Sequence, residues 1–269
     1  MTELEQSIQI AKEAGTILLK SRQLNLDVGY KGNDPFDPVT SADMASEKYI
    51  GQALQQAFPD DQILSEEHES KNVNFTKRVW LVDPLDGTKE YIAGSNDFTV
   101  HIALWDGHKL VLGVVHAPAI DTTWYATEHN GAFQLTQGVS KHLTTSTVSE
   151  IADSRVVTRN NRGDERPLDI LVEKLRVAER IPRGSIGIKL CLIAQGLADI
   201  HINTNARASK WDTAAPQVIL EEAGGIITDL SGGLLKYMQP GVQWKGSFIA
   251  SANQTLHDTA LTAIKTYTI

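Results

Sequence analysis

The sequence predicts a fold of mixed α+β and α/β type, organised as two closely packed halves that meet near residue 145. The first half, 1–145, contains strand-like runs joined by short, hairpin-type connections at residues 98–105, 111–117 and 123–126, which is typical of an antiparallel meander. After a polar passage at 136–153, strands and helices alternate through the second half, 146–269, as they do in α/β proteins.

Helical patterns surround these strands. Apolar residues recur at three-to-four spacing from about Leu4 to Arg22, and a second helix is expected to begin at Thr40 or Ser41 and to end near Phe58. Between them, the glycines and prolines of 27–38 indicate a loop that closes over something. In the second half, the expected helices are 167–175, 186–197, 213–223 and 256–264, and the expected strands are 155–158, 200–202, 226–228 and 247–250.

Composition narrows the class of protein. The chain has 269 residues, of which 41% are hydrophobic and 22% charged, so it can bury a full core. Its net charge of -8 argues against general binding to nucleic acid. The single cysteine, Cys191, lies in an apolar run and indicates a reducing compartment. Residues 1–19 match neither a signal peptide nor a membrane span. We therefore expect a cytoplasmic protein without membrane insertion, as a monomer or homodimer.

The most informative stretch runs from Trp80 to Glu90. A buried strand is expected to end in Asp83-Pro84-Leu85-Asp86, where ionised carboxylates must meet water or a cation. The two aspartates and the Leu85 carbonyl offer the oxygen ligands that Mg²⁺ prefers. The amides of Gly87 and Thr88 follow at the start of an expected helix, where an anion such as phosphate is favoured. In isolation, this pattern would more often be an Asp-Gly turn with a helix cap.

Other acids support the cation-site interpretation. A second short strand, 62–64, also ends in acids at Ser65-Glu66-Glu67, and two such strand ends suit a shared cation. Asp43 either serves the dipole of its own helix or faces the Asp83 turn. Asp212 is either an N-cap of the helix 213–223 or a third carboxylate, supplied by the second half across a cleft.

These motifs together resemble the inositol monophosphatase superfamily. The ordered set is Leu64-Ser65-Glu66-Glu67, Asp83-Pro84-Leu85-Asp86-Gly87-Thr88, Trp211-Asp212-Thr213-Ala214-Ala215 and Glu222-Ala223-Gly224-Gly225. The resemblance covers nearly the whole chain. It implies a layered α-β-α-β-α sandwich and a phosphatase that uses two or three Mg²⁺ ions and is sensitive to lithium.

The resemblance also implies roles for individual residues. The implied metal ligands are Glu66, Asp83, the Leu85 carbonyl, Asp86 and Asp212. Thr88, with Glu66 and Asp43, would position the attacking water, and the amides of Gly87 and Thr88 would hold the phosphate. No covalent nucleophile is indicated, since Cys191 lies in an apolar helix. His68 and His101 are interpreted as surface or strand residues, because the other candidate ligands are all oxygens.

Within the superfamily, Lys89-Glu90-Tyr91 resembles the CysQ-type branch of 3'(2'),5'-bisphosphate nucleotidases, as do Lys189-Leu190-Cys191 and the segment 37–43. The loop 203–210 lacks an acid for sugar hydroxyls and contains Arg207 and Lys210, which suit a second anionic group. Gly184-Ser185-Ile186-Gly187 is closer to the inositol enzymes. The expected substrate contacts are Glu66, Leu85, Asp86, Gly87, Thr88, Lys89, Ser185, Lys189, Arg207 and Asp212.

The resulting hypothesis is hydrolysis of the 3'-phosphate of 3'-phosphoadenosine 5'-phosphate to give AMP, with 3'-phosphoadenosine 5'-phosphosulfate as a second candidate substrate. The alternative is an inositol monophosphatase or another sugar-phosphate phosphatase, which would share the metal site and differ at the rim. A non-catalytic relative that senses Mg²⁺ or nucleotide is a third class. The intact set of acids with Thr88 argues against it, because a sensor does not need a residue that positions water.

Overall fold

The computed structural model describes residues 1–24, 27–30, 38–67, 73–159, 166–204, 208–239, 241–242 and 247–267. The helices are α1 (Glu3–Ser21), α2 (Ser41–Ala57), α3 (Thr88–Ile92), α4 (Arg166–Leu175), α5 (Ile186–Ala194), α6 (Lys210–Glu222) and α7 (Gln254–Tyr267). The strands of the first half are β1 (Val28–Tyr30), β2 (Pro38–Thr40), β3 (Gln62–Ser65), β4 (Val79–Asp86), β5 (Thr99–Trp105), β6 (Leu110–Ala117), β7 (Thr122–Thr127), β8 (Ala132–Thr136) and β9 (Val139–His142). Those of the second half are β10 (Arg155–Arg159), β11 (Glu179–Arg183), β12 (Ile200–Asn203), β13 (Ile226–Asp229) and β14 (Phe248–Ser251).

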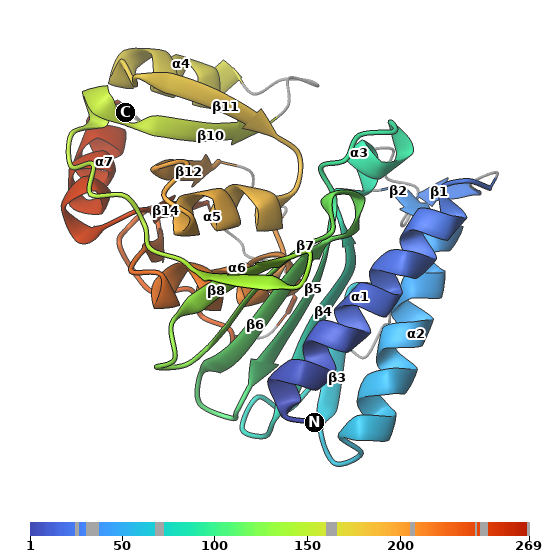
Figure 1. Cartoon of the computed structure of the whole chain (residues 1–269). Coiled ribbons are helices and arrows are strands. Elements are labelled where there is room, and N and C mark those ends of the chain that lie inside the picture. Colours follow the sequence, from blue (N-terminus) through green and yellow to red (C-terminus); the bar gives the residue numbers. More distant parts are fainter. Residues whose placement is uncertain are drawn as a thin grey trace.

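The elements form five layers in the order α-β-α-β-α (Figure 1). Helices α1 and α2 cover one face of a large sheet, and α5 and α6 lie against its other face. The second sheet packs on the far side of α5 and α6, and α4 and α7 close the outside. This layered sandwich confirms the predicted fold class. Among the described residues, no helix has both the length and the hydropathy needed to cross a bilayer.

Among the described residues, the large sheet has seven strands in the order β3-β4-β5-β6-β7-β8-β9. Of the strand pairs that the structure describes in this sheet, only β3-β4 is parallel, so both strands end at the same edge of the sheet. The remaining pairs are antiparallel, as the meander pattern predicts. The register between β4 and β5 shifts between Asp83 and Asp86, and this irregularity accommodates Pro84 within the strand.

In the described part of the chain, the second sheet has five strands in the order β11-β10-β12-β14-β13. Its β10 strand pairs in parallel with β11 and β12, whereas β14 is antiparallel to both of its neighbours. The parallel pairing of β10 with β11 and β12 agrees with the alternation of strands and helices in this half of the sequence, because a helix between two strands allows them to run in the same direction.

Helix α6 packs very closely on the large sheet. A Cβ atom added to Gly113 of β6 would lie 2.3 Å from the Ala215 carbonyl oxygen of α6, so only glycine allows this approach. Trp211, Ala214 and Ala215 join the core between the two sheets, which contains buried residues of both halves of the chain. This packing fixes the start of α6, and with it Asp212, against the middle strands of the sheet.

Several predicted boundaries are wrong. Residues 28–30 and 38, expected within a loop, and 39–40, expected where the second helix opens, pair as the antiparallel strands β1 and β2. Residues 31–37 of the expected loop lie outside the described residues. The polar passage 136–153 contains β9, which extends the edge of the large sheet. Strand β11 has no apolar pattern because it is an edge strand, where Pro182 and exposed charges are tolerated. The strand expected at 80–82 continues through both aspartates to Asp86.

Candidate active site

Strands β3 and β4 bring the two acidic strand ends together. Because these strands are parallel, Glu66 follows β3 beside the end of β4, and its amide nitrogen lies 3.3 Å from the Val82 carbonyl oxygen. Asp83 is 1% exposed, and its Oδ1 accepts a hydrogen bond of 3.0 Å from the Leu85 amide. This contact tightens the turn around Pro84 and leaves Asp83 and Asp86 on neighbouring positions of the same edge.

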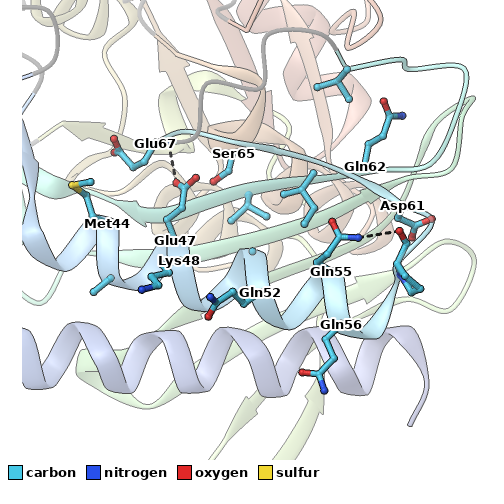
Figure 2. A pocket seen from close by; sticks show the side chains of 16 residues that line it. Met44, Glu47, Lys48, Gln52, Gln55, Gln56, Asp61, Gln62, Ser65 and Glu67 are labelled. Atoms are coloured by element: carbon cyan, nitrogen blue, oxygen red, sulfur yellow. Dashed lines mark hydrogen bonds between the residues drawn. The ribbon is translucent and has the colours of Figure 1, made fainter.

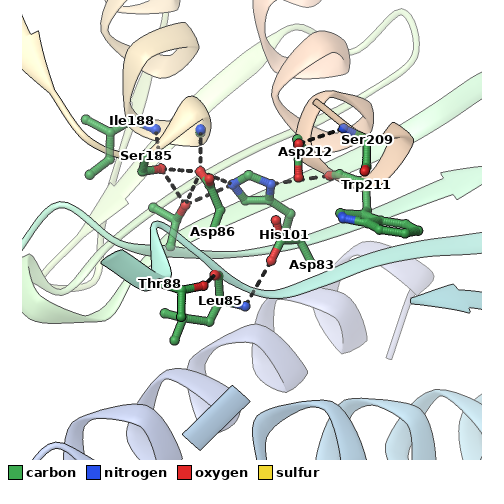
Figure 3. Close-up of polar contacts among 12 residues, drawn as sticks. Asp83, Leu85, Asp86, Thr88, His101, Ser185, Ile188, Ser209, Trp211 and Asp212 are labelled. Atoms are coloured by element: carbon green, nitrogen blue, oxygen red, sulfur yellow. Dashed lines mark hydrogen bonds and ion pairs between the residues drawn. The ribbon is translucent and has the colours of Figure 1, made fainter. Parts of the chain in front are cut away.

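Asp212 reaches the same place from α6. The sequence allowed it to be the N-cap of this helix, and that alternative is wrong. Ser209 occupies the N-cap position, and Asp212 is the third residue of the helix. Its Oδ2 accepts a hydrogen bond of 2.7 Å from the Ser209 amide, which holds the carboxyl group at the helix start (Figure 3). The second half of the chain therefore supplies one acid to the cluster.

The four acids interact strongly. Burial, followed by the charges of Glu66, Asp86 and Asp212, raises the pKa of Asp83 well above its ordinary value. Burial and the charges of Glu66 and Asp86 likewise raise the pKa of Asp212. Within the described residues, no lysine or arginine forms an ion pair with Asp83, Asp86 or Asp212. An excess of buried negative charge of this kind suits a cation.

Asp86 differs from its neighbours, because it is held by several donors. Burial alone would raise its pKa, but contacts with His101, Ser185 and the Gly187 amide lower the pKa below its ordinary value. The Ser185 hydroxyl donates to Oδ2 of Asp86, and the Gly187 amide donates to the same oxygen at 2.9 Å (Figure 3). The start of α5 therefore orients the ionised form of Asp86.

Asp43 and Thr88 meet beside the acid cluster. The Thr88 hydroxyl lies 3.3 Å from Oδ1 of Asp43 and 3.2 Å from the Leu85 carbonyl oxygen. The other carboxylate oxygen of Asp43 accepts hydrogen bonds from the amide and hydroxyl of Thr40. Burial raises the pKa of Asp43 to about 6, with the Thr40 hydrogen bonds opposing that rise and the charge of Glu66 adding to it. Asp43 is thus a carboxylate poised to accept a proton near neutral pH.

Gly87 makes the turn that presents Thr88. It has a φ of 94°, in the left-handed region, and a Cβ atom there would lie 2.7 Å from the Asp97 carbonyl oxygen. The five-residue helix α3 starts directly after it at Thr88. A glycine is therefore required both by backbone conformation and by space.

The expected substrate contacts are distributed unevenly. Lys89 is partly exposed on α3, whereas Ser185 is fully buried and bonded to Asp86, Thr99 and the Ile188 amide. Lys189 is 4% exposed and interacts electrostatically with Glu90. Arg207 lies outside the described residues. The contacts of these residues with substrate stay predictions.

Lys210 does not belong to the rim, although the sequence suggested that it did. It is 1% exposed, and its Nζ donates to the Gln239 carbonyl oxygen at 2.5 Å and lies 4.6 Å from the centre of the Phe75 ring. Burial lowers the pKa of this ammonium to about 8. Lys210 therefore anchors the start of α6 to the neighbouring segments and is closed to substrate.

A cavity of about 1240 Å³ lies between α2 and β3 (Figure 2). At one end of it, Oε2 of Glu47 accepts a hydrogen bond of 2.9 Å from the Glu67 amide, which fixes the turn after β3. Asp83, Asp86 and Asp212 do not line this cavity. Its contribution to the site is therefore indirect, through the position of the Glu66-Glu67 turn.

The sequence pattern did not indicate two features of the site. His101, interpreted as an ordinary strand residue, contacts Asp86, and Thr99 lies between His101 and Ser185. No local pattern marks them, because their roles arise from the register of β5 with β4 and from α5 packing above. Among the described residues, no three His, Cys, Asp or Glu side chains form a ready-made set of metal ligands. The metal site stays a prediction that rests on the charge of the cluster.

Comparison with known proteins agrees with this architecture. The model of the inositol monophosphatase family matches residues 1–268. A relative from Salmonella typhimurium, 3'(2'),5'-bisphosphate nucleotidase CysQ, is 36% identical over 87% of this chain and 93% of its own. A histidinol-phosphatase from Mycobacterium tuberculosis is 32% identical over 89% of each chain. The IMPase of Thermotoga maritima superposes with a TM-score of 0.85 and 27% identity, covering 100% of this chain and 98% of its own.

The chain therefore belongs to the inositol monophosphatase family. The resemblance inferred from the ordered motifs is confirmed, and several CysQ proteins from other bacteria are 32–34% identical to this chain.

Proposed function

We propose that the protein is a Mg²⁺-dependent phosphatase that removes the 3'-phosphate of 3'-phosphoadenosine 5'-phosphate to give AMP. The observation that carries the proposal is the juxtaposition of the buried acid cluster with the Asp43–Thr88 pair. The choice of a nucleotide substrate is supported by the CysQ relatives and by Lys89-Glu90 after the Asp-Gly-Thr motif. The phosphosulfate analogue is proposed as a second substrate.

The residues of the cluster fit a divalent cation. Glu66, Asp83, the Leu85 carbonyl, Asp86 and Asp212 would provide the hard oxygen ligands that Mg²⁺ prefers, and they would hold two or three ions. When bound there, Mg²⁺ supplies Lewis-acid activation of water and neutralises charge on the phosphate during in-line displacement. Burial and the charges of neighbouring acids raise the pKa values of Asp83 and Asp212, so added positive charge would favour their ionised forms.

The chain's own residues would move the proton. Thr88 donates its hydroxyl hydrogen toward Asp43, which leaves an oxygen lone pair free to accept a proton from the attacking water. As that proton reaches Thr88, the hydroxyl proton of Thr88 passes to Oδ1 of Asp43. The amides of Gly87 and Thr88 would hold the phosphate at the start of α3, and Lys89 would face a second anionic group.

Two substrates measured side by side test this proposal. Phosphate release from 3'-phosphoadenosine 5'-phosphate and from inositol 1-phosphate is compared with and without Mg²⁺ and lithium, with histidinol phosphate as a third ester. We expect Mg²⁺-dependent release with a large preference for the nucleotide. Preference for inositol 1-phosphate would keep the metal site and overturn the specificity. Turnover that survives Asp83→Asn and Asp86→Asn would overturn the metal mechanism.

A further inference from the structure

His101 is buried beneath the candidate active site. It is fully buried on β5, where it lies opposite Asp83 of β4 in the register of the sheet. Side chains alternate along β5, and His101 faces α5 and α6 together with Ala103 and Trp105. A polar ring in this position must find partners on the elements that cover it.

Both ring nitrogens have such partners. Nε2 lies 3.4 Å from Oδ2 of Asp86 and 2.8 Å from the Thr99 hydroxyl oxygen. Nδ1 lies 3.4 Å from the carbonyl oxygen of Trp211, in the first turn of α6 (Figure 3). Asp212 is the next residue. The ring therefore spans from an acid of the first half to the residue that precedes the acid of the second half.

The chain makes room for this ring with a glycine. A Cβ atom at Gly187 would lie 2.2 Å from Nε2 of His101 and 2.8 Å from the Thr99 hydroxyl oxygen. The amide of the same glycine donates to Oδ2 of Asp86. His101 and Gly187 therefore fit as a pair, and a side chain at position 187 would push the ring away from its partners.

We propose that His101 is a positioning residue that sets the separation between Asp86 and the first turn of α6, and so between Asp86 and Asp212. This inference rests on the proposed cation site of the preceding subsection, and it deepens that proposal by assigning a residue that touches neither cation nor substrate. Groups that orient ligands from the outer shell typically contribute about 10–100-fold to metal affinity. His101 orients ligands from both halves of the chain at once.

Mg²⁺ binding without substrate provides the test, measured by isothermal titration calorimetry on the full chain. His101→Leu removes both polar contacts, and we expect it to weaken Mg²⁺ binding about 10–100-fold. His101→Gln places an amide nitrogen near the position of Nε2 and keeps the link to Asp86. His101→Asn places its amide near the position of Nδ1 and keeps the link to Trp211. Both variants should bind Mg²⁺ with intermediate affinity.

His116 offers a matched control. It is a buried histidine on the adjacent strand β6, where its Nδ1 contacts the Thr123 hydroxyl away from the acids. His116→Leu should lower the melting temperature and leave Mg²⁺ affinity unchanged. Equal affinity in the Gln, Asn and wild-type proteins would overturn the inference even if the Leu variant does not fold.

The outcomes also separate this inference from the proposed function. A wild-type protein that binds Mg²⁺ but hydrolyses none of the esters would overturn the proposed function, while weaker binding in His101→Leu would still support the role of His101. If the wild-type protein is active and all three His101 variants keep its Mg²⁺ affinity, the proposed function is supported and the role of His101 is overturned. A wild-type protein that binds no Mg²⁺ would overturn both.

Discussion

The hydroxyl of Thr88 lies 3.3 Å from Oδ1 of Asp43, across 45 residues of sequence. The opposite oxygen of Asp43 is occupied by Thr40, so the carboxylate cannot rotate freely and Oδ1 remains directed at Thr88. Thr40 is also the N-cap of α2. A helix-capping interaction thus orients the carboxylate that we propose as proton acceptor.

Replacing Thr88 tests the proton path. Thr88→Val keeps the shape and removes the hydroxyl, so we expect kcat to fall about 10²–10⁴-fold, the usual contribution of general acid–base catalysis. Thr88→Ser keeps the hydroxyl and should retain most of the activity. Steady-state phosphate release gives kcat and KM for each variant.

A buried threonine away from the site serves as the control for Thr88. Thr122 is 4% exposed on β7 and bonds to Thr136, so Thr122→Val should leave kcat unchanged. Equal activity in the Val and Ser variants of Thr88 would show that its hydroxyl carries no proton.

The pH dependence of turnover follows from Asp43. Burial raises the pKa of Asp43 to about 6, and only its ionised form can accept a proton. We therefore expect kcat to fall as the pH decreases through about 6 and to level off above neutral pH. A pH profile of kcat for wild type and Asp43→Asn gives the measurement. If kcat falls over the same acidic pH range in wild type and in Asp43→Asn, another group is responsible for that decrease.

Many individual helices and strands were predictable because they depend on patterns that are local in sequence, whereas the order of the layers followed from the family resemblance. Strand-like runs with short connections predict β5 to β7, three-to-four spacing predicts α1, and the start signal at Thr40 or Ser41 predicts α2. Edge strands escaped this reasoning. Strand β9 is exposed and polar, so its pairing with β8 depends on contacts that no short window shows. The pairing of β1 with β2 was missed for a related reason, since these short strands contain Gly29 and Pro38, which are typical of a loop.

The acids of the site were predictable, whereas the residues that orient them were not. Asp83 and Asp86 stand out because charged residues at the end of an apolar strand demand an explanation. His101 gives no such signal, because an isolated histidine in a strand is common. Lys210 was misplaced because its charge suggested exposure, whereas its side chain extends beneath Phe75 to the Gln239 carbonyl oxygen.

Asp83 should be a site where stability and function oppose each other. Burial and neighbouring acids raise its pKa, so its ionised form at neutral pH destabilises the fold when no cation is bound. Its contribution to stability is therefore greatest below the unfolded pKa of about 3.9 and is lost as the pH rises toward the higher folded value. Asp83→Asn should raise the melting temperature in EDTA, by about 2–4 °C for each kcal/mol gained in the free energy of unfolding when the charge repulsion is removed. The same substitution should abolish stabilisation by Mg²⁺.

Thermal unfolding with EDTA and with Mg²⁺ checks both parts of the Asp83 prediction. The Asn side chain can still accept the hydrogen bond from the Leu85 amide, so the turn should survive the substitution. Asp61→Asn is the comparison, since Asp61 is paired with Arg78 rather than with other acids, and we expect it to destabilise the protein. A lower melting temperature for Asp83→Asn in EDTA would contradict the proposed charge repulsion.

His116 should make the fold sensitive to acid. Burial lowers its pKa to about 4, and the nearby charge of Lys12 adds to that effect. In the unfolded chain its pKa is about 6.5, so between these values the unfolded state binds more protons and stability decreases as the pH falls. The difference corresponds to a loss of about 2 kcal/mol between about pH 7.5 and about pH 5. Above about pH 7.5, His116 is almost entirely neutral in both states and contributes no pH dependence.

Urea unfolding of wild type and His116→Gln at these two pH values isolates that contribution. The Gln variant should lose about 2 kcal/mol less than wild type on acidification, although part of the dependence will remain because burial also lowers the pKa of His201, to about 3. His129→Gln is the control, since the side chain of His129 is 85% exposed and its removal should leave the slope unchanged. The predicted difference between the two proteins arises because the fold keeps the His116 imidazole neutral. If wild type and His116→Gln lose the same stability on acidification, His116 is therefore not the acid-sensitive group.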